Sequence, residues 1–351
     1  MALADTDYGT FLQNDASPLS PSTIRDRALE KLSAEFQYLR SEASHELGRF
    51  LDYISIDYQI DSLMLILKAT LNNPNVNITA LVDQAHPLGQ FKPSTLKAIC
   101  AFDNSPKGYA DLYQTVIIDT PIGPYFQQFL KDEADRSASV GDVRNILEEM
   151  PTTKLENTLR KLYLEDFANF CDSLGGETAT LMGDLLKARA DAMTINIALN
   201  SFGTTLNEVS MRADRKLLYP SIGFLYPDGT NRLAVVGSEE ELVEALKPFK
   251  AYSDVLNKYV SGETTVDDAF YAREVMLCEL AFEGQFNYSC FYCYVRLREQ
   301  EIRNLVWACE TIVQKQKSKM NQHVRPFSLH LRANGPLVGA NLQHQQSMED
   351  G

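Results

Sequence analysis

The sequence predicts an all-α protein, and three observations support this fold class. Apolar residues recur at the i, i+3 and i+4 spacing of an amphipathic helix through most of the chain. Helix-start signals such as Ser-Pro, and helix-stop signals such as Gly-Gly and Asn-Pro, fall where this spacing begins and breaks. Strand signals are short: residues 233–236 could form one strand, whereas the spacing around residues 115–119 favours a helix.

The N-terminal part is predicted to contain two long helices followed by a loop-rich segment. Residues 1–19 are polar and rich in turn-forming residues. Ser20 and Pro21 form a helix start, with serine as the cap and proline at the first helical position. The expected elements are helices at about 20–51 and 53–71, a loop-rich segment at 74–106 with a short helix near Leu96, and helices at about 109–118 and 122–133.

The C-terminal part has stronger helical signals. A continuous apolar stripe marks residues 155–174, and Gly175-Gly176 ends it. Two capping boxes mark later helix starts, Ser238 with Glu241 and Thr265 with Asp268. The expected elements are helices at about 155–174 and 177–200, a turn-rich segment at 218–229, and helices at about 242–246, 265–282 and 288–317.

An internal repeat predicts three related helical bundles. Asp61, Asp191 and Glu301 are each followed four residues later by an aliphatic residue within an apolar run, at comparable intervals along the chain. Chance similarity between amphipathic helices is the alternative explanation. The predicted division is an N-terminal loop at 1–19, helical lobes at 20–135, 136–230 and 231–327, and a disordered tail at 328–351.

Composition excludes several classes of function. The formal net charge is −14, and lysine and arginine are scattered rather than gathered into a stripe, which argues against binding nucleic acid or anionic lipid directly. No apolar run approaches the roughly 20 residues that a membrane-spanning helix needs. The chain is therefore expected to be soluble, and either cytosolic or held at a membrane through partners only. Cys290 and Cys293 match the spacing of a redox or zinc half-site, but a packed, reduced pair is favoured.

Motifs that would identify an enzyme are missing from the sequence. There is no phosphate-binding GxxxxGK[ST], no HExxH and no GxSxG. We therefore expect no catalytic residues, no cofactor and no metal. Several polar residues lie inside apolar helical stretches, where a buried charge needs a partner. These residues predict a structural network of ion pairs and hydrogen bonds: Asp61, Asp191, Arg298, Glu301, Arg303 and Asn304.

Aromatic and proline residues gather in the turn segments. Such residues are often local packing contacts at helix ends, but aromatic anchors also dominate the binding energy of protein interfaces. The turns at 87–91, 120–126 and 219–229 are therefore candidate docking segments. The candidate docking residues are Pro87, Leu88, Phe91, Pro121, Tyr125, Phe126, Tyr219, Phe224 and Tyr226.

Seven sequence blocks, in order, resemble one known family. They are TDYGTFLQNDASPL at 6–19, HPLGQF at 86–91, IIDTPIGPYF at 117–126, YLEDFANFCDSLGG at 163–176, INIALNSFGTTL at 195–206, LYPSIGFLYPDG at 218–229 and FYCYVRLREQEIRNLVWACETI at 291–312. The chain thereby resembles the subunit d family of V-type proton ATPases, which includes a related protein of the archaeal-type rotary ATPases. The family pattern usually starts some tens of residues upstream and ends near residues 325–327.

The resemblance implies a three-lobed, pseudo-threefold helical funnel and a non-catalytic role. In that family the protein sits on the cytosolic mouth of the proteolipid c-ring in vacuolar and other endomembranes. It receives the central-stalk subunits D and F and transmits their rotation to the ring, with subunit a alongside. The alternatives are an all-α enzyme with a carboxylate-based site, which predicts a deep pocket with acids of raised pKa, and a general helical scaffold, which predicts a short regular repeat.

Overall fold

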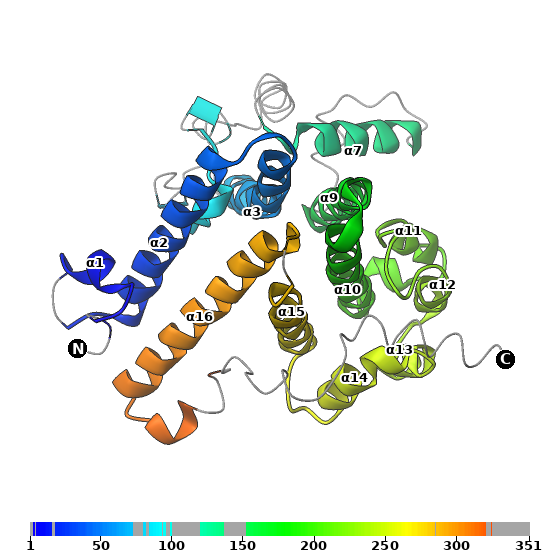
Figure 1. The fold of residues 1–351 in the computed structure, drawn as a ribbon. Helices are drawn as coiled ribbons and strands as arrows, with labels where there is room; N and C mark the ends of the chain where they lie inside the picture. Colours follow the sequence, from blue (N-terminus) through cyan, green and yellow to red (C-terminus); the bar gives the residue numbers. More distant parts are fainter. Residues whose placement is uncertain are drawn as a thin grey trace.

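The computed structural model describes residues 3, 5–15, 18–72, 80–81, 84–92, 94–95, 99, 120–136, 152–284, 286–320 and 324. Every regular element within these residues is helical and none is a strand, so the all-α prediction is confirmed (Figure 1). The α-helices are α1 (Gly9–Leu12), α2 (Pro21–Glu42), α3 (His45–Asn72), α7 (Gly123–Arg136), α9 (Thr152–Leu174), α10 (Gly176–Ser201), α11 (Arg212–Leu217), α12 (Asp228–Val235), α13 (Glu239–Leu246), α14 (Ser253–Val260), α15 (Val266–Phe282) and α16 (Ser289–Val313). Short 3-10 helices are η1 (Pro87–Gly89), η2 (Thr205–Asn207), η3 (Lys250–Tyr252) and η4 (Lys317–Lys319).

The long helices pack side by side in a continuous series. The series runs α2, α16, α15, α10, α9 and α3, and each helix contacts the next (Figure 1). Helices α2 and α3 also contact each other, which returns the series to its start. The short helices α11–α14 lie together beside α10 and α15. Within the described ranges, no helix combines the length and the apolar character that crossing a membrane requires.

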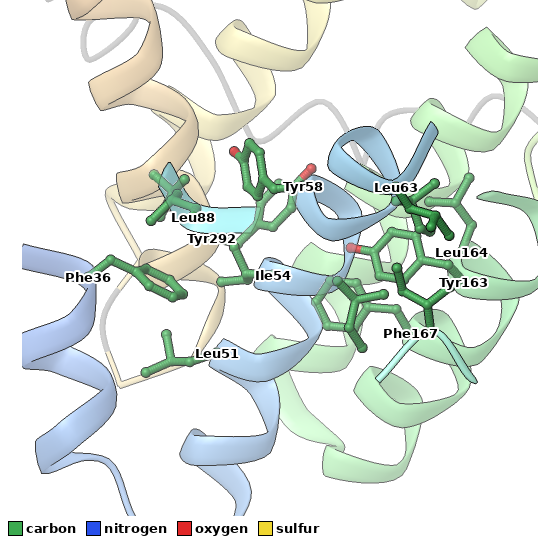
Figure 2. Close-up of a cluster of buried hydrophobic side chains, with 14 of the residues drawn as sticks. Phe36, Leu51, Ile54, Tyr58, Leu63, Leu88, Tyr163, Leu164, Phe167 and Tyr292 are labelled. Carbon is green, nitrogen blue, oxygen red and sulfur yellow. The ribbon is translucent and has the colours of Figure 1, made fainter. Parts of the chain in front are cut away.

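Buried hydrophobic side chains form two clusters among the described residues. The larger cluster lies between α2, α3, α7, α9, α10, α15 and α16, and Figure 2 shows part of it around Phe167. There the Tyr53 ring stacks on Phe167 and Phe170, with centroids 5.0 and 4.8 Å away. The smaller cluster is built by α12–α14 and the segment that follows α11, against the C-terminal half of α10 and the N-terminal half of α15. Helices α10 and α15 therefore belong to both clusters and join them, while the division into three lobes stays a prediction.

The expected helix starts agree with the capping contacts. Ser20 Oγ accepts a hydrogen bond from Thr23 N at 3.0 Å, Ser238 Oγ from Glu241 N at 3.3 Å and Thr265 Oγ1 from Asp268 N at 3.1 Å. Gly175, with φ of 68°, separates α9 from α10 as the Gly-Gly signal predicts. The helices expected near Leu96 and at 109–118, and the tail at 328–351, lie outside the described residues.

Two predicted boundaries were wrong. The first long helix ends at Glu42 rather than near residue 51, and the next begins at His45. Apolar spacing continues across this corner, which is marked instead by the extended backbone of Ala43 and by φ of 48° at His45. Arg40 on α2 and Asp52 on α3 pair across it, with Nε–Oδ1 at 2.6 Å.

The strand considered at 233–236 is also wrong, because residues 228–235 form helix α12. Four short apolar residues cannot distinguish a strand from a buried helical turn. The deciding contacts come from Arg215, which is fully buried in α11. Its guanidinium donates to the carbonyls of Leu233, Ala234 and Val236 at 2.7–3.0 Å and so satisfies the C-terminal end of α12.

Candidate functional site: a buried ion-pair network and a surface turn

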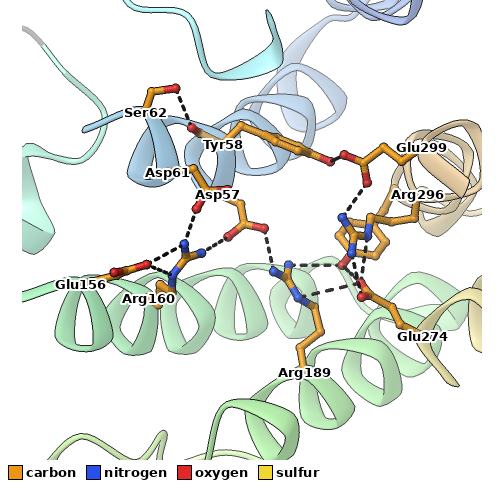
Figure 3. A network of polar contacts seen from close by, with 11 residues as sticks. Asp57, Tyr58, Asp61, Ser62, Glu156, Arg160, Arg189, Glu274, Arg296 and Glu299 are labelled. Atoms are coloured by element: carbon orange, nitrogen blue, oxygen red, sulfur yellow. Dashed lines mark hydrogen bonds and ion pairs between the residues drawn. The ribbon is translucent and has the colours of Figure 1, made fainter. Parts of the chain in front are cut away.

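A network of charged side chains lies where five long helices converge. Figure 3 shows its members pointing toward one another. Asp57 and Asp61 come from α3, Glu156 and Arg160 from α9, Arg189 from α10, Glu274 from α15, and Arg296 and Glu299 from α16. Each long helix of the series contributes at least one charge except α2, so this central network links most of the series.

Two arginines, Arg189 and Arg160, hold one side of the central network. Arg189 Nη2 lies 2.6 Å from Asp57 Oδ2, and Arg160 Nη1 lies 3.3 Å from Asp57 Oδ1. Arg160 also pairs with Asp61, and with Glu156 at 3.2 Å. One carboxylate of α3 therefore contacts arginines of both α9 and α10.

The other side of the central network is centred on Arg296. Its Nη2 and Nε lie 2.8 and 3.0 Å from the two oxygens of Glu274, a bidentate pair between α16 and α15. Its Nη1 lies 2.6 Å from Glu299 Oε2. Arg189 Nε lies 3.8 Å from Glu274 Oε1 and joins the two sides.

Tyrosine hydroxyls complete the hydrogen bonding. Tyr58 donates to Glu299 Oε1 and Tyr292 donates to Glu274 Oε1, both at 2.8 Å. Arg189 Nη1 in turn donates to the Tyr292 hydroxyl at 3.2 Å. Buried charges are tolerated when their remaining hydrogen-bonding positions are occupied, as they are here.

The electrostatics keep two carboxylates of the central network, Asp57 and Glu274, ionised. Burial alone would raise the pKa of Asp57, but the charges of Arg189 and Arg160 outweigh it, and the pKa lies below its usual value. Burial would also raise the pKa of Glu274, but the charges of Arg296 and Arg189 outweigh it, and this pKa too lies below its usual value. A general acid needs the opposite shift. Burial does raise the pKa of Asp61 at the edge of the network, although the charge of Arg160, which pairs with it, opposes the rise. Asp57 and Glu274 are therefore suited to holding helices together rather than to proton transfer.

The structure places the six predicted network residues at separate points. Asp61 lies at the edge of the central network through Arg160. Arg298 pairs with Glu301 at 2.6 Å and lies 3.4 Å from Glu35 of α2. Arg303 lies 3.6 Å from Asp268 of α15, and Asn304 Oδ1 accepts a hydrogen bond from Gln300 at 2.7 Å. Four of the six thus lie along α16, where Arg298 and Arg303 bridge to its two neighbours.

Asp191 lies apart from these ion pairs and holds a turn in place. Its side chain is 0% exposed and accepts hydrogen bonds from Phe224 N at 2.9 Å, Leu225 N at 3.1 Å and the Tyr252 hydroxyl. Burial raises its pKa to about 6, although the Tyr252 hydroxyl and the two amides oppose the shift. A side chain at Gly223, where φ is 127°, would overlap the Asp191 carboxylate. We call residues 221–227 the anchored turn.

The nine candidate docking residues divide into buried and accessible groups. Leu88, Phe91, Tyr125, Phe126 and Tyr219 are all buried, and their side chains pack within the two clusters. Pro121 and Tyr226 are exposed, while Pro87 and Phe224 are half-buried. Phe224 and Tyr226 both belong to the anchored turn, which therefore contains two accessible candidates only two positions apart in the sequence.

Sequence reasoning found Asp61 but missed the rest of the central network. Its other charged members are Asp57, Glu156, Arg160, Arg189, Glu274, Arg296 and Glu299. A signal existed for Asp57, which precedes Asp61 by four residues and so shares its helix face within an apolar segment. No spacing rule could have paired it with Arg189, because that contact joins residues 132 positions apart.

Among the described residues, the thiols and the other metal-binding side chains form no additional centre. Cys290 and Cys293 are free cysteines, and the Cys290 thiol donates to the Asn287 carbonyl at 3.1 Å. Among the residues that the structure describes, no group of three or more histidine, cysteine, aspartate or glutamate side chains could hold a metal ion.

Comparison with known proteins gives one consistent family. The sequence matches the family described as ATP synthase (C/AC39) subunit over residues 1–323. A "V-type proton ATPase subunit d" from Dictyostelium discoideum is 42% identical over 93% of this chain and 85% of that protein. A "V-type proton ATPase subunit d2" from Arabidopsis thaliana is 39% identical over 92% of this chain and 86% of that protein. The Saccharomyces cerevisiae "V-type proton ATPase subunit d" is 34% identical over 93% of this chain and 88% of that protein.

Proposed function

The chain belongs to the ATP synthase (C/AC39) subunit family, and on this premise we propose that it serves as the non-catalytic subunit d of a V-type proton ATPase. The observation that carries the proposal is the similarity to relatives of that name over more than nine tenths of the chain. In this role it joins the central-stalk subunits D and F to the proteolipid c-ring, with subunit a alongside. It reaches the cytosolic face of endomembranes through these partners.

Rigidity of the helical series supports a role in transmitting rotation. A part that transmits torque must resist bending, and close-packed helices supply that resistance. Here ion pairs also join the helices, since Arg189 of α10 contacts Asp57 of α3 and Glu274 of α15, and Arg296 of α16 contacts Glu274 as well. Breaking one buried pair of this kind typically costs about 3–5 kcal/mol, because the remaining charge stays buried without its partner. The central network thus opposes sliding of the helices against one another.

The anchored turn is the best-supported docking segment. Tyr226 is 50% exposed while the backbone beside it is fixed by Asp191. An aromatic side chain on a fixed backbone requires less ordering of the chain on binding, so more of its contact energy appears as affinity. We therefore assign docking to Phe224 and Tyr226, with Pro121 and Pro87 as further accessible candidates, and not to the five buried residues.

Binding of the purified full-length chain to separate partners tests this function. One assay captures the proteolipid ring and another captures the complex of subunits D and F. We expect the wild-type chain to bind both and to show no ATP hydrolysis by itself. Binding to neither partner, or turnover of ATP by the isolated chain, would remove the proposed role.

A variant pair tests the anchored turn within the same assays. We expect Phe224→Ala combined with Tyr226→Ala to weaken one of the two interactions by about tenfold or more, as loss of an aromatic anchor does. Tyr38→Ala is the matched control, because Tyr38 is a 67% exposed tyrosine on α2 outside the candidate segments. If the double variant binds both partners as the control does, the docking assignment is wrong while the subunit role stands.

A further inference from the structure

A pocket of about 330 Å³ lies beside α16, away from the anchored turn. Its walls come from α2, α15, α16 and the residue that precedes η1. The described residues that line it are Arg25, Leu29, His86, Tyr271, Arg296, Glu299, Ile302, Arg303, Val306 and Trp307. Its volume is at the lower end of the range for small-molecule sites, which starts at roughly 300 Å³.

The pocket lining carries excess positive charge in a chain of net charge −14. Three arginines line it against one acid, Glu299, which Arg296 already neutralises at 2.6 Å. Arg296 is occupied as well, since it also pairs with Glu274. Arg25 and Arg303 are the lining arginines whose acidic partners, Asp26 and Asp268, lie outside the lining and are about half exposed.

These two arginines are held only weakly by acids of the protein. Arg25 pairs with its neighbour Asp26, and both side chains are more than half exposed. Arg303 lies 3.6 Å from Asp268, and both are about half exposed. Exposed pairs contribute little, so a ligand anion can compete for either guanidinium. The ring of Tyr271, 4.2 Å from the Arg303 guanidinium carbon, supports that arginine at the pocket wall.

The rest of the lining is apolar and aromatic. Leu29, Ile302 and Val306 provide aliphatic surface between the charged positions. Trp307, the single tryptophan of the chain, is 41% exposed and presents a planar surface at the same pocket. A ligand that fits both parts of the lining has an anionic group and a small apolar, preferably planar, body.

We propose that this pocket binds a small organic anion, of the aryl phosphate or aryl carboxylate class, through Arg25 and Arg303 with its apolar body against Trp307 and Ile302. The guanidinium groups supply the charge-assisted hydrogen bonds that phosphate and carboxylate oxygens accept. This function is independent of the adaptor role, because it involves neither the anchored turn nor partner proteins. It gives the protein a site at which a small organic anion contacts the edge of the central network at Arg296 and Glu299.

Trp307 fluorescence tests the proposal directly in the full-length protein. Titration with phenyl phosphate, with tryptophan excited selectively, should give a saturable change in emission. Benzyl alcohol, which has the ring without the charge, should give none at the same concentrations. Raising the ionic strength should weaken the phenyl phosphate affinity, because the contacts are partly exposed ion pairs. Absence of saturation, or equal binding of benzyl alcohol, overturns the proposal.

A charge-removing variant provides the second test. Arg25→Gln with Arg303→Gln should lower the affinity for phenyl phosphate by about tenfold or more, since each charge-assisted contact is lost. The matched control, Arg232→Gln with Lys258→Gln, removes the same charge from positions on α12 and α14 outside the pocket and should bind as the wild type does. Equal affinity in both variants overturns the assignment. Circular dichroism confirms folding, and the single variant Arg25→Gln, at an exposed site, replaces the double variant if that one unfolds.

Discussion

At Asp191, burial of the side chain opposes the negative charge of its carboxylate. Its carboxylate is fully buried and accepts hydrogen bonds from two backbone amides and a tyrosine hydroxyl, while the charge of Arg273 has a smaller effect on its pKa. These donors fix the anchored turn, but they do not offset the cost of burying the charge, and the pKa rises to about 6. The Asp191 carboxylate therefore holds the backbone beside Tyr226 in place, but it lowers the free energy of unfolding when it is ionised.

The raised pKa of Asp191 predicts a distinct pH dependence. Because the folded state holds this proton more tightly than the unfolded chain, stability falls as the pH rises from 3.8 to about 6 and stays level above. Relative to Asp191→Asn, which cannot titrate, the wild type should lose about 3 kcal/mol of unfolding free energy across that interval. Urea unfolding of both proteins at a series of pH values measures the difference. A difference that does not change with pH would contradict the assigned pKa.

Gly223 should tolerate no side chain. With φ of 127° and the Asp191 carboxylate against its missing Cβ, Gly223→Ala should destabilise the protein by about 2–4 kcal/mol. Gly262→Ala is the control, because its φ is 72° but no atom lies within 4 Å of the added Cβ. The control should lose only the backbone cost of about 1–2 kcal/mol. Thermal unfolding of both variants compares them, and equal losses would mean that Asp191 does not constrain the turn.

At the scale of elements, the fold depends on how α3, α9, α10, α15 and α16 are locked together. Asp57 and Glu274 have folded-state pKa values below their usual 3.8 and 4.5. The ion pairs of Asp57 and Glu274 therefore contribute their full stabilisation above pH 3.8 and 4.5, respectively. This stabilisation is lost as the pH falls through the lower folded-state pKa of each carboxylate. This acid sensitivity has the opposite sign to that of Asp191, so the two effects can be separated.

Removing Arg296 should show the strength of the central network. Arg296→Met leaves the half-buried carboxylates of Glu274 and Glu299 without their nearest cation and should cost about 3–5 kcal/mol. Arg40→Met, which breaks the exposed α2–α3 pair with Asp52, should cost less than about 1 kcal/mol. Chemical denaturation measures both.

A double variant identifies the cause of the Arg296 effect. Adding Glu274→Gln to Arg296→Met should recover part of the loss, since one unpaired buried charge disappears. Glu274→Gln alone is measured as well. If the loss in the double variant equals the sum of the losses in the two single variants, Arg296 and Glu274 do not interact energetically.

Helix existence was predictable from the sequence where local signals suffice, as at the Ser20, Ser238 and Thr265 caps and the stripe of α9. The corner at Ala43 and the helical state of 228–235 were not, because the first interrupts no apolar pattern and the second depends on Arg215 of another helix. The same reason explains the central network: its pairs join helices far apart in sequence. Exposure of the docking residues also depends on packing, and Phe126 and Tyr219 lie inside.

At the scale of the whole molecule, one series of helices joins two hydrophobic clusters and a central set of ion pairs. The long helices α10 and α15 belong to both clusters, so a force applied to the short helices α11–α14 reaches the central network through them. The anchored turn lies directly against α10 through Asp191. A partner bound at that turn would thus be connected to the rest of the protein without a flexible link.

Proton uptake per ATP hydrolysed, measured in vesicles that carry the reconstituted V-type ATPase, tests the adaptor role most directly. Preparations assembled with this chain as the only subunit d should acidify the vesicle lumen in proportion to ATP hydrolysis. Preparations assembled without it should hydrolyse ATP with little or no acidification. If acidification per ATP is the same with and without the chain, it does not couple the stalk to the ring.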